Sequence, residues 1–340
     1  MNSKEFAKLI GVSQPTVSRA LNDNPLVPEE KRKWIKEKAR EYGFVLNTSA
    51  RSLRTNRTDT IGILFPKHFV GMTENPMMAY LYDKIQIELH KHGFDIMVVY
   101  SDTDEEDLTA LERMIRTKKV DGFLILKLEM TNAERALIEQ EKTPCVCMMN
   151  AASKIRDDIS YYFSDSEYGG YLAGEYLGRY PEYQKMYISY SGEKADNKRR
   201  YDGYCKGLKE HGVEESEILR LECDLSMESG YQLVLDHKDL LLNQKSAILV
   251  YCDMIATGVI QGLNEIGAEI PQQVQLIGMD DLPMSANIRP GLSTIHVNAE
   301  NMVPAACTHL IDMINGKKKA EDEVTQIWLK PSLVLRGTTK

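Results

Sequence analysis

Short apolar runs alternate with amphipathic stretches over most of this chain of 340 residues. From residue 60 onward each apolar run is five or six residues long and is bounded by polar or turn-forming residues. Runs of this length predict buried β-strands rather than helices, which need a longer pattern. The predicted strands are IGILF (61–65), DIMVVY (95–100), GFLIL (122–126), CVCMM (145–149), MYISY (186–190), AILVY (247–251) and VQLIGM (274–279).

Amphipathic helical patterns separate many of these runs, for example at Tyr80–His92, Glu105–Thr117 and Tyr168–Tyr180. Strands that alternate with helices form right-handed βαβ units and parallel sheets covered on both faces, which is an α/β fold. About 280 residues follow this pattern, which is too much for one ordinary sheet. We therefore expect two doubly wound lobes with a ligand between them, at the carboxyl ends of the strands.

The first 46 residues show a helical pattern instead. Asn2 and Glu5 have the spacing of a capping box, and Gly11 fits the left-handed end of the helix that they open. Ser13 can cap a second helix by accepting from the amide of Thr16, and Pro15 lies in the first turn, where its missing N–H costs nothing. The sequence predicts two helices joined by a tight turn.

The second predicted helix has an apolar and a polar face. Val17, Ala20 and Leu21 form the inner stripe, and a third helix follows at Pro28–Tyr42. Two short helices with this turn are typical of a helix-turn-helix, whose second helix enters the major groove of DNA. An αα-hairpin that merely packs is the alternative. The basic, core-poor stretch at 47–57 favours the DNA-binding interpretation.

Charge is distributed unevenly along the chain, whose net charge is −8. Residues 1–57 contain twelve Lys and Arg against six Asp and Glu, whereas residues 58–340 contain thirty against forty-four. A basic first segment on an acidic remainder indicates that the first segment meets a polyanion.

Several classes of protein lack support in the sequence. No apolar run approaches the ~20 residues of a membrane helix, and Met1–Glu5 shows no start of a signal peptide. The six cysteines are scattered and the seven histidines show no metal-ligand spacing, so we expect reduced thiols in the cytoplasm and no metal or cofactor. No G-x-S-x-G, Walker, H-E-x-x-H or G-x-G-x-x-G motif is present, and the adjacent Asp280 and Asp281 point different ways on a strand end. We do not expect an enzyme.

Specific motifs then carry a family resemblance. The segments are VSQPTVSRALN (12–22), ARSLRTNRTDTIGIL (50–64), DSEYGG (165–170), RYDG (200–203), GMDDLP (278–283) and PGLSTI (290–295). The chain resembles the LacI/GalR family of bacterial transcriptional regulators in this order, from about Asn2 to Thr338. The resemblance implies a helix-turn-helix domain at 1–46, a hinge helix or linker at 47–59, and an effector-binding and dimerisation domain at 60–340. Its two lobes would be similar to type I periplasmic binding proteins, with crossovers near 161–164, 285–295 and 320–326.

The resemblance also implies residues that contact DNA. Gln14, Pro15 and Arg19 match positions that face bases, and an arginine can bind guanine O6 and N7 with both arms. Leu53 matches a hinge leucine that inserts into the minor groove, with Arg51 and Arg54 beside it; a minor packing contact is the alternative. Residues expected to touch phosphate or to cap structure are Thr16, Ser18 and Asn22.

A second set of residues is implied for a small-molecule effector. Arg200 and Asp280 match the arginine and aspartate that bind effector hydroxyls or a carboxylate. The other positions are Asn75, Met77, Met78, Asp165, Cys252 and Asp253. An aspartate could instead cap a helix, and the arginine could form an ion pair. Cys252 stands where the family has Asn or Ser, and methionines replace aromatic residues that would stack on a sugar, so the sequence leaves open whether the effector is an ordinary hexose.

The predicted function is therefore a cytoplasmic repressor of carbohydrate-utilisation genes that binds a pseudo-palindromic operator in double-stranded DNA as a homodimer, under control of a sugar-like effector. No leucine heptads follow Lys330, which favours a dimer over a tetramer. Two alternatives share the fold: a purine or a phosphoprotein as co-repressor. A solute-binding protein is the alternative from another class. The basic first segment argues against it, and so does the lack of signal-peptide character in Met1–Glu5.

Overall fold

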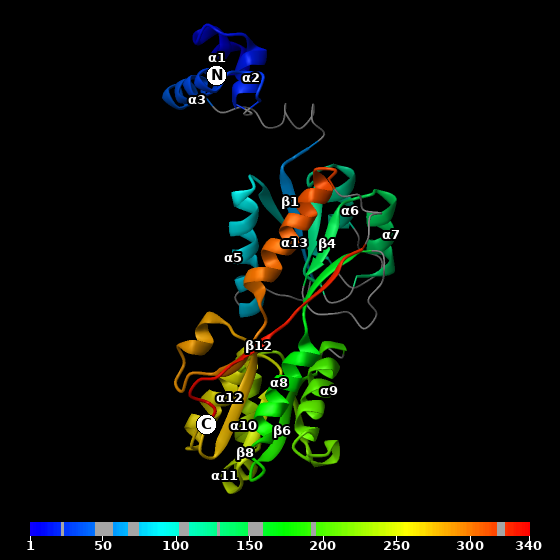
Figure 1. The fold of residues 1–340 in the computed structure, drawn as a ribbon, viewed down its shortest axis with the longest axis vertical. Coiled ribbons are helices and arrows are strands. Elements are labelled where there is room, and N and C mark those ends of the chain that lie inside the picture. The colour runs from blue at the N-terminus through cyan, green and yellow to red at the C-terminus, as the bar shows by residue number, and fades with distance from the viewer. Residues whose placement is uncertain are drawn as a thin grey trace. The chain divides into compact units, whose positions relative to one another are not determined.

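A computed structural model describes residues 1–21, 24–44, 57–66, 75–101, 109–127, 130–148, 159–191, 195–317 and 324–340 (Figure 1). The chain divides into two compact units, Met1–Asp59 and Thr60–Lys340. Some residues with a predicted DNA contact lie outside the described ranges, namely Asn22, Arg51, Leu53 and Arg54.

The first unit consists of three helices around a small core. They are α1 (Ser3–Leu9), α2 (Gln14–Leu21) and α3 (Glu29–Glu41). The capping box of Asn2 and Glu5 is present, and Gly11 has a φ of +69°, which a residue with a Cβ adopts only with strain. The rings of Phe6 and Phe44 stack with centroids 4.2 Å apart, so the segment that follows α3 packs back onto α1.

The first lobe of the second unit contains a parallel sheet in the order β11-β5-β4-β3-β1-β2. Its strands are β1 (Thr60–Pro66), β2 (Asp95–Ser101), β3 (Gly122–Ile125), β4 (Cys145–Met148), β5 (Ser160–Ser164) and β11 (Gln326–Leu329). Its helices are α5 (Pro76–Lys91), α6 (Thr109–Arg116), α7 (Asn132–Gln140) and α13 (Ala299–Ile314). Helices α5 and α13 lie side by side on this sheet (Figure 1).

The second lobe contains a sheet in the order β12-β10-β9-β8-β6-β7, parallel except that β12 runs antiparallel to β10. Its strands are β6 (Gln184–Tyr190), β7 (Leu219–Cys223), β8 (Ser246–Val250), β9 (Val274–Asp280), β10 (Ser293–His296) and β12 (Ser332–Val334). Its helices are α8 (Ser166–Gly178), α9 (Ala195–Lys209), α10 (Met227–Asp236), α11 (Lys238–Asn243) and α12 (Asp253–Glu265), with 3₁₀ turns η1 (Glu215–Glu217) and η2 (Pro283–Ala286).

The predicted fold of two doubly wound lobes is confirmed, and each of the seven predicted runs forms a strand. The first crossover follows the expected 161–164 directly, whereas the second and third lie later in the chain than expected. Residues 160–164 form β5 in the first lobe, so the first crossing comes at Asp165. The others come at 297–298, after β10, and at 330–331, after β11, rather than near 285–295 and 320–326. β5 and β10 are short and rich in Ser, Thr and Tyr, and β11 has only four residues and begins with Gln326, so their hydrophobic signal is weak.

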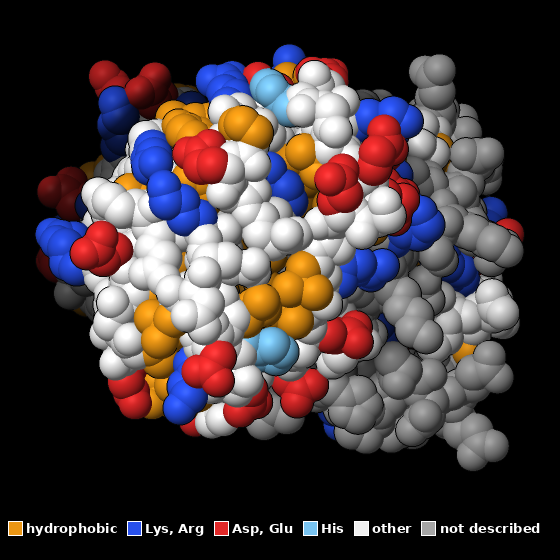
Figure 2. All heavy atoms as spheres, turned by 90° about the horizontal axis from the view of Figure 1, so that it is seen from below, with side chains coloured by type: hydrophobic (Ala, Val, Ile, Leu, Met, Phe, Trp, Pro, Cys, Tyr) orange, Lys and Arg blue, Asp and Glu red, His pale blue; other side chains and the backbone are white. Residues whose placement is uncertain are grey.

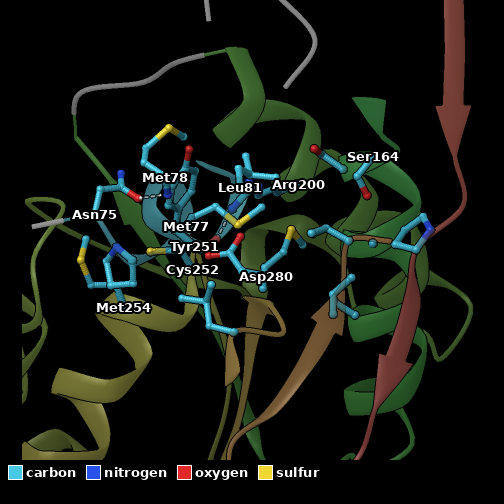
Figure 3. A pocket seen from close by; sticks show the side chains of 18 of the residues that line it. Asn75, Met77, Met78, Leu81, Ser164, Arg200, Tyr251, Cys252, Met254 and Asp280 are labelled. Carbon is cyan, nitrogen blue, oxygen red and sulfur yellow. Dashed lines mark hydrogen bonds between the residues drawn. The ribbon is translucent and has the colours of Figure 1, made fainter. Parts of the chain in front are cut away.

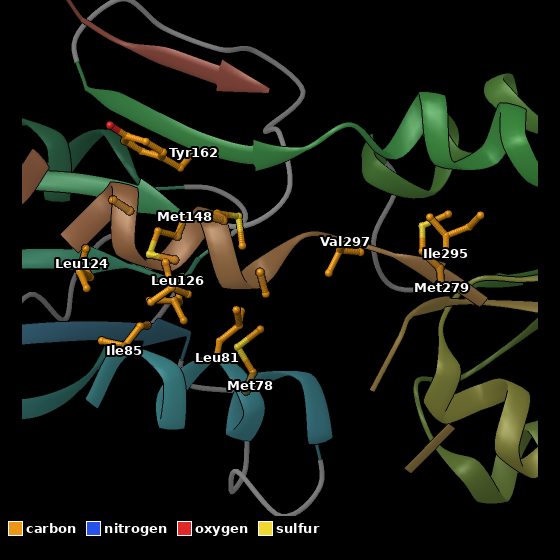
Figure 4. Close-up of a cluster of buried hydrophobic side chains, with 14 of the residues drawn as sticks. Met78, Leu81, Ile85, Leu124, Leu126, Met148, Tyr162, Met279, Ile295 and Val297 are labelled. Carbon is orange, nitrogen blue, oxygen red and sulfur yellow. The ribbon is translucent and has the colours of Figure 1, made fainter. Parts of the chain in front are cut away.

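Apolar side chains fill the first lobe between its sheet and its covering helices (Figure 4). Leu81 and Ile85 of α5 are fully buried there, together with Leu124 of β3. The same cluster continues through the crossing segments to Met279 and Ile295 at the end of the second lobe. The two lobes therefore share a continuous apolar core through the crossing segments.

Helices α8 and α9 approach each other closely because glycines lie on both facing surfaces. A Cβ added at Gly203 of α9 would lie 1.8 Å from the carbonyl oxygen of Glu167, and one at Gly170 of α8 would lie 2.0 Å from the carbonyl oxygen of Arg200. Such distances require backbone movement if a side chain is added. The glycines thereby fix the position of Arg200 relative to the start of α8.

The face shown in Figure 2 carries acidic and basic side chains intermixed with scattered apolar ones. Mixed charge of this kind is ordinary for a protein surface. Among the described residues, no helix is both long enough and apolar enough to span a bilayer.

Candidate functional site

Helix α2 has one buried and one exposed face, as the sequence predicts. Val17 and Ala20 are fully buried against the other two helices, while Gln14, Pro15 and Arg19 are exposed. The hydroxyl of Ser13 accepts a hydrogen bond from the amide of Thr16 at 3.3 Å, and the hydroxyls of these two residues lie 2.7 Å apart. Ser18, like Thr16, is partly buried. The exposed face offers one guanidinium and one amide side chain from the first two turns of a helix.

A pocket of about 120 Å³ lies between the two lobes of the second unit (Figure 3). It lies at the carboxyl ends of parallel strands, because β5 ends at Ser164, β6 at Tyr190 and β9 at Asp280. This is where ligands bind in open α/β sheets. Predicted effector residues that line it are Asn75, Met77, Met78, Asp165, Arg200, Cys252 and Asp280.

Arg200 provides the charged donor of the pocket and is 4% exposed. One of its terminal nitrogens lies 2.7 Å from a carboxylate oxygen of Asp196, one turn earlier on α9. The other donates to the carbonyl oxygen of Tyr251, whose ring lies 4.2 Å below the guanidinium. Burial is the largest single influence and acts to lower the pKa of Arg200, but the electrostatic contributions of Asp196, Tyr251 and Asp280 together outweigh it, so the net shift is upward and the side chain stays charged. Its buried Nε has no hydrogen-bond partner within the described part of the chain and can donate to a ligand.

Asp280 ends β9 and points into the pocket (Figure 3). It is 8% exposed, and its φ of 137° is rare for a residue with a side chain. Burial, with Asp253 nearby, raises the pKa of Asp280 well above the ordinary 3.8. A buried carboxyl at a strand end can accept two hydroxyl or N–H donors from a ligand.

Asp253 does not line the pocket, although the sequence placed it among the effector residues. Its fully buried carboxylate accepts from the amide of Leu282 at 3.0 Å and from the hydroxyls of Ser285 and Thr294, each at 2.5 Å. These bonds connect the start of α12 to η2 and β10. The carboxylate therefore fixes the backbone behind Asp280.

The first lobe contributes an apolar wall. Met77 and Met78 line the pocket from the first turn of α5, with Leu81 one turn further on. Asn75 caps this helix by accepting from the amide of Met78 at 3.2 Å, and it also faces the pocket (Figure 3). The side chain of Asn75 therefore caps α5 and lines the pocket at the same time.

Asp165 lies where the chain first crosses between the lobes. Its side chain caps α8 by accepting from the amide of Tyr168 at 3.1 Å. The guanidinium of Arg199 lies 3.7 Å from this carboxylate and stacks on the ring of Trp328 in β11 at 4.6 Å. Arg199 thus connects a helix of the second lobe to a strand of the first.

The sequence did not identify Asp196, Tyr190 and Tyr251 as part of this site. Tyr190 and Tyr251 line the pocket from the second lobe with ring centroids 5.5 Å apart, whereas Met77 and Met78 line it from the first lobe. Asp196 could have been found from its i,i+4 spacing to Arg200 on a predicted helix. The thiol of Cys252 is buried, and burial followed by the charge of Asp280 raises its pKa, so it stays protonated.

None of the six cysteines forms a disulfide. In the described ranges, no group of three or more His, Cys, Asp or Glu side chains is placed to hold a metal ion. The described polar lining of the pocket includes the guanidinium of Arg200, the carboxyl groups of Asp165 and Asp280, the amide of Asn75 and the hydroxyls of Tyr190 and Tyr251.

Two family models match the chain. The model for bacterial regulatory proteins of the lacI family matches residues 4–47, and the model for a periplasmic binding protein-like domain matches residues 184–339. The first match covers the three-helix unit. The second covers most of the second lobe together with α13 and β11 of the first lobe.

Similar proteins cover nearly the whole chain. The HTH-type transcriptional repressor PurR of Edwardsiella ictaluri (strain 93-146) is 30% identical over 338 residues, which are 98% of this chain and 95% of that protein. A LacI family transcriptional regulator from Enterococcus faecium with bound ribose is 26% identical, covers 82% of this chain and 98% of its own, and has a TM-score of 0.70. The lac repressor dimer bound to operator and the anti-inducer ONPF is 20% identical, covers 100% and 99%, and has a TM-score of 0.79, which shows the shared fold.

Proposed function

The chain belongs to the lacI family of bacterial regulatory proteins, and we propose that it is a repressor whose operator affinity is set by a small polar effector bound between its two lobes. The observation that carries the proposal is that one chain combines an exposed recognition face on α2 with a pocket holding Arg200 and Asp280 at strand ends. The protein acts in the cytoplasm, where chromosomal DNA lies, and works as a regulator rather than an enzyme.

In this proposal α2 lies in the major groove. Arg19 forks onto a guanine, Gln14 pairs with an adenine or a phosphate, and Pro15 offers an apolar surface to a thymine methyl. Thr16 and Ser18 position the helix on phosphates. Arg51, Leu53 and Arg54 contact the minor groove as a hinge, together with the same residues of a second copy. Two copies related by a twofold axis read a pseudo-palindromic operator.

The DNA-binding part is tested with an operator selected from a random duplex pool by the full-length protein. A bidentate arginine contact carries about 1–3 kcal/mol of discrimination, so Arg19→Ala should lower affinity for the selected duplex and leave affinity for a scrambled one nearly unchanged. Lys33→Ala is the control, because this exposed lysine of α3 pairs with Glu29 at 2.7 Å. Equal loss on both duplexes would remove Arg19 from base recognition.

The effector is proposed to be a monosaccharide or a related polyol. One water needs about 10–15 Å³ by the same measure, so a pocket of about 120 Å³ has room for a small ligand. Arg200 and Asp280 supply the donor and acceptor that hydroxyl groups need. The curated relative from E. ictaluri is named a PurR repressor, and the apolar wall of Met77, Met78 and Leu81 suits a flat base, so a purine is the second candidate.

Thermal shift of the purified protein against sugars, polyols and purines decides between these classes. A ligand that binds the folded state alone stabilises it by RT ln(1 + [L]/Kd), about 2.7 kcal/mol at a hundredfold excess. Each compound that stabilises the protein is then added to the operator complex, and its effect on DNA release is measured. Arg200→Ala should abolish both responses. Stabilisation without any change in DNA affinity would leave ligand binding intact and overturn the regulatory proposal.

Control of DNA binding requires that the effector favours one arrangement of the lobes. A ligand that contacts both Arg200 of the second lobe and Met77 of the first changes their relative position, because it binds one arrangement more tightly. Coupling of this kind amounts to about 1–3 kcal/mol in typical allosteric proteins. A solute-binding protein would have the pocket and no use for α2, which is why the regulator is preferred.

A further inference from the structure

The charges around the pocket are unbalanced. Among the lining residues that the structure describes, Arg200 is the only lysine or arginine, and Asp165 and Asp280 line the same pocket. Asp196 and Asp253 stand directly behind Arg200 and Asp280, respectively. Carboxyl groups therefore outnumber guanidinium groups at this site.

Asp196 already matches the charge of Arg200. Their closest atoms are 2.7 Å apart, and the two side chains are 5% and 1% exposed, so water screens this pair very little. The guanidinium also donates to the carbonyl oxygen of Tyr251 and stacks on its ring. Arg200 thus offers a hydrogen-bond donor to a ligand without offering a net positive charge.

Within the described part of the chain, no ion pair joins Asp280 to a lysine or arginine. Arg200 is paired with Asp196, and Asp253 is a second carboxyl close to Asp280. Arg199, the other guanidinium close to the pocket, is directed to Asp165 at 3.7 Å and to Glu167 at 3.8 Å. An anionic ligand placed against Arg200 would therefore also face the carboxyl groups of Asp196 and Asp280 in a poorly screened site.

We propose that Asp196 determines the charge selectivity of this pocket, so that it admits effectors without an anionic group and rejects phosphorylated or carboxylated ones. This inference rests on the proposed function, since it concerns the effector of the same pocket. An arginine in a pocket is usually an anion-binding group, because its fork matches phosphate and carboxylate. Here the neighbouring carboxylate on the same helix removes that preference, and Nε remains as a donor to neutral oxygen atoms.

The test uses inorganic phosphate as the probe, titrated into the full chain by calorimetry at constant ionic strength. The variant is Asp196→Asn, which keeps the shape of the side chain and removes its charge. The matched control is Asp202→Asn on the same helix, where the carboxylate pairs with Lys198 and the two side chains are 72% and 40% exposed for Lys198 and Asp202. Phosphate binding to the basic first unit is common to all variants and cancels in the comparison.

We expect Asp196→Asn to bind phosphate at least tenfold more tightly than the unchanged protein, and Asp202→Asn to match the unchanged protein. Adding Arg200→Gln to Asp196→Asn should remove the gain, because the guanidinium is the group released from its partner. The proposal is overturned if Asp196→Asn leaves phosphate affinity unchanged, or if the unchanged protein binds phosphate as tightly as the variant.

Loss of one partner from a buried ion pair can prevent folding, so each variant is first checked by urea denaturation. If Asp196→Asn does not fold, Asp196→Ser takes its place, because it also removes the carboxylate charge beside Arg200 and should also tighten phosphate binding. An unchanged affinity in Asp196→Ser then overturns the proposal. DNA release plays no part in this test, so a failure of the regulatory function and a failure of charge selectivity are seen in separate experiments.

Discussion

The two lobes contribute different chemistry to the pocket between them. The second lobe supplies the charged and aromatic groups of Arg200, Asp280 and Tyr251, which are buried, together with the thioethers of Met254 and Met279; Arg200 is held by a hydrogen bond and a ring contact to Tyr251. The first lobe supplies mainly apolar side chains, among them Met77 and Met78. A ligand is therefore oriented by one lobe and enclosed by the other.

The difference is also one of rigidity. Asp253 holds the backbone behind Asp280 with three hydrogen bonds, and the glycines of α8 and α9 place Arg200 by backbone contact. Methionine side chains have several rotatable bonds and adapt to the shape of what they meet. The comparison teaches that specificity is concentrated in the second lobe, whereas the first lobe can close on ligands of differing outline.

The largest effect is expected from disturbing the backbone contact of the second lobe. Gly203→Ala places a Cβ 1.8 Å from the carbonyl oxygen of Glu167, so α8 and α9 must separate. We expect the free energy of unfolding to fall by about 3 kcal/mol or more, measured by urea denaturation.

Gly291→Ala is the control for that variant, because its Cβ would meet nothing nearer than 3.6 Å. It should unfold like the unchanged protein. If Gly203→Ala were as stable as the unchanged protein, the close approach of α8 and α9 would not determine the position of Arg200.

Next in size is the removal of the carboxylate behind Asp280. Asp253→Ala leaves the amide of Leu282 and the hydroxyls of Ser285 and Thr294 without their acceptor. Buried unsatisfied donors cost about 1–3 kcal/mol, so stability should fall by about 2 kcal/mol, with Asp202→Ala as the exposed control. A loss of effector affinity without a loss of stability would instead place Asp253 among the ligand contacts, as the sequence suggested.

Asp253 also shows where sequence reasoning ends. A motif match puts Asp253 and Asp280 in one functional set, but which carboxyl faces the pocket depends on how η2 and β10 fold back over the start of α12. That arrangement is made by contacts between residues about thirty to forty positions apart, which no local pattern contains. For Asp196 the reverse holds. Its i,i+4 spacing to Arg200 can be read from the sequence, but the burial that makes this ion pair important for the pocket can be seen only in the structure.

The fold was easier to predict because its signal is local and repeated. Each buried run such as 122–126 is long and apolar enough to be identified alone, and alternation with helices then determines parallel sheets. Strands β5, β7, β10, β11 and β12 were not among the predicted runs; in β10 and β11, Ser293, Thr294 and Gln326 dilute the pattern. Missing them displaced the expected crossovers, although the two lobes themselves were predicted correctly.

A smaller effect concerns pH and the polar side of the pocket. Asp280 faces Asp253 of α12 and both Arg200 and Asp196 of α9, and burial raises its pKa. The folded protein holds this proton more tightly than the unfolded chain, so stability is fully present below the ordinary pKa of 3.8 and is lost as pH rises through the raised value. Asp280→Asn should therefore be about 1 kcal/mol more stable at neutral pH without ligand.

The measurement is urea denaturation of both proteins at several pH values from 4 to 8. The difference in free energy of unfolding between the two proteins should widen as pH rises. Both proteins also share a pH dependence from Asp253, because burial raises the pKa of that residue as well. If the stabilities of the two proteins changed with pH in parallel, ionisation of Asp280 would cost no stability in the folded protein. The polar groups of the second lobe would then be no more costly to hold in place than the apolar groups of the first.

The smallest effect is expected on the apolar side. Met77→Leu keeps the volume and removes the thioether, so stability should change by about 0.5 kcal/mol. Effector affinity should change less than for any substitution in the second lobe, while the range of accepted ligands should narrow, because leucine has fewer rotamers than methionine. Thermal shift over the sugar, polyol and purine panel measures that range, with Met227→Leu as the control at a methionine that is 40% exposed and does not line the pocket. A loss of binding as large as that of Arg200→Ala would make the first lobe an equal source of specificity, and the division of labour between the lobes would be wrong.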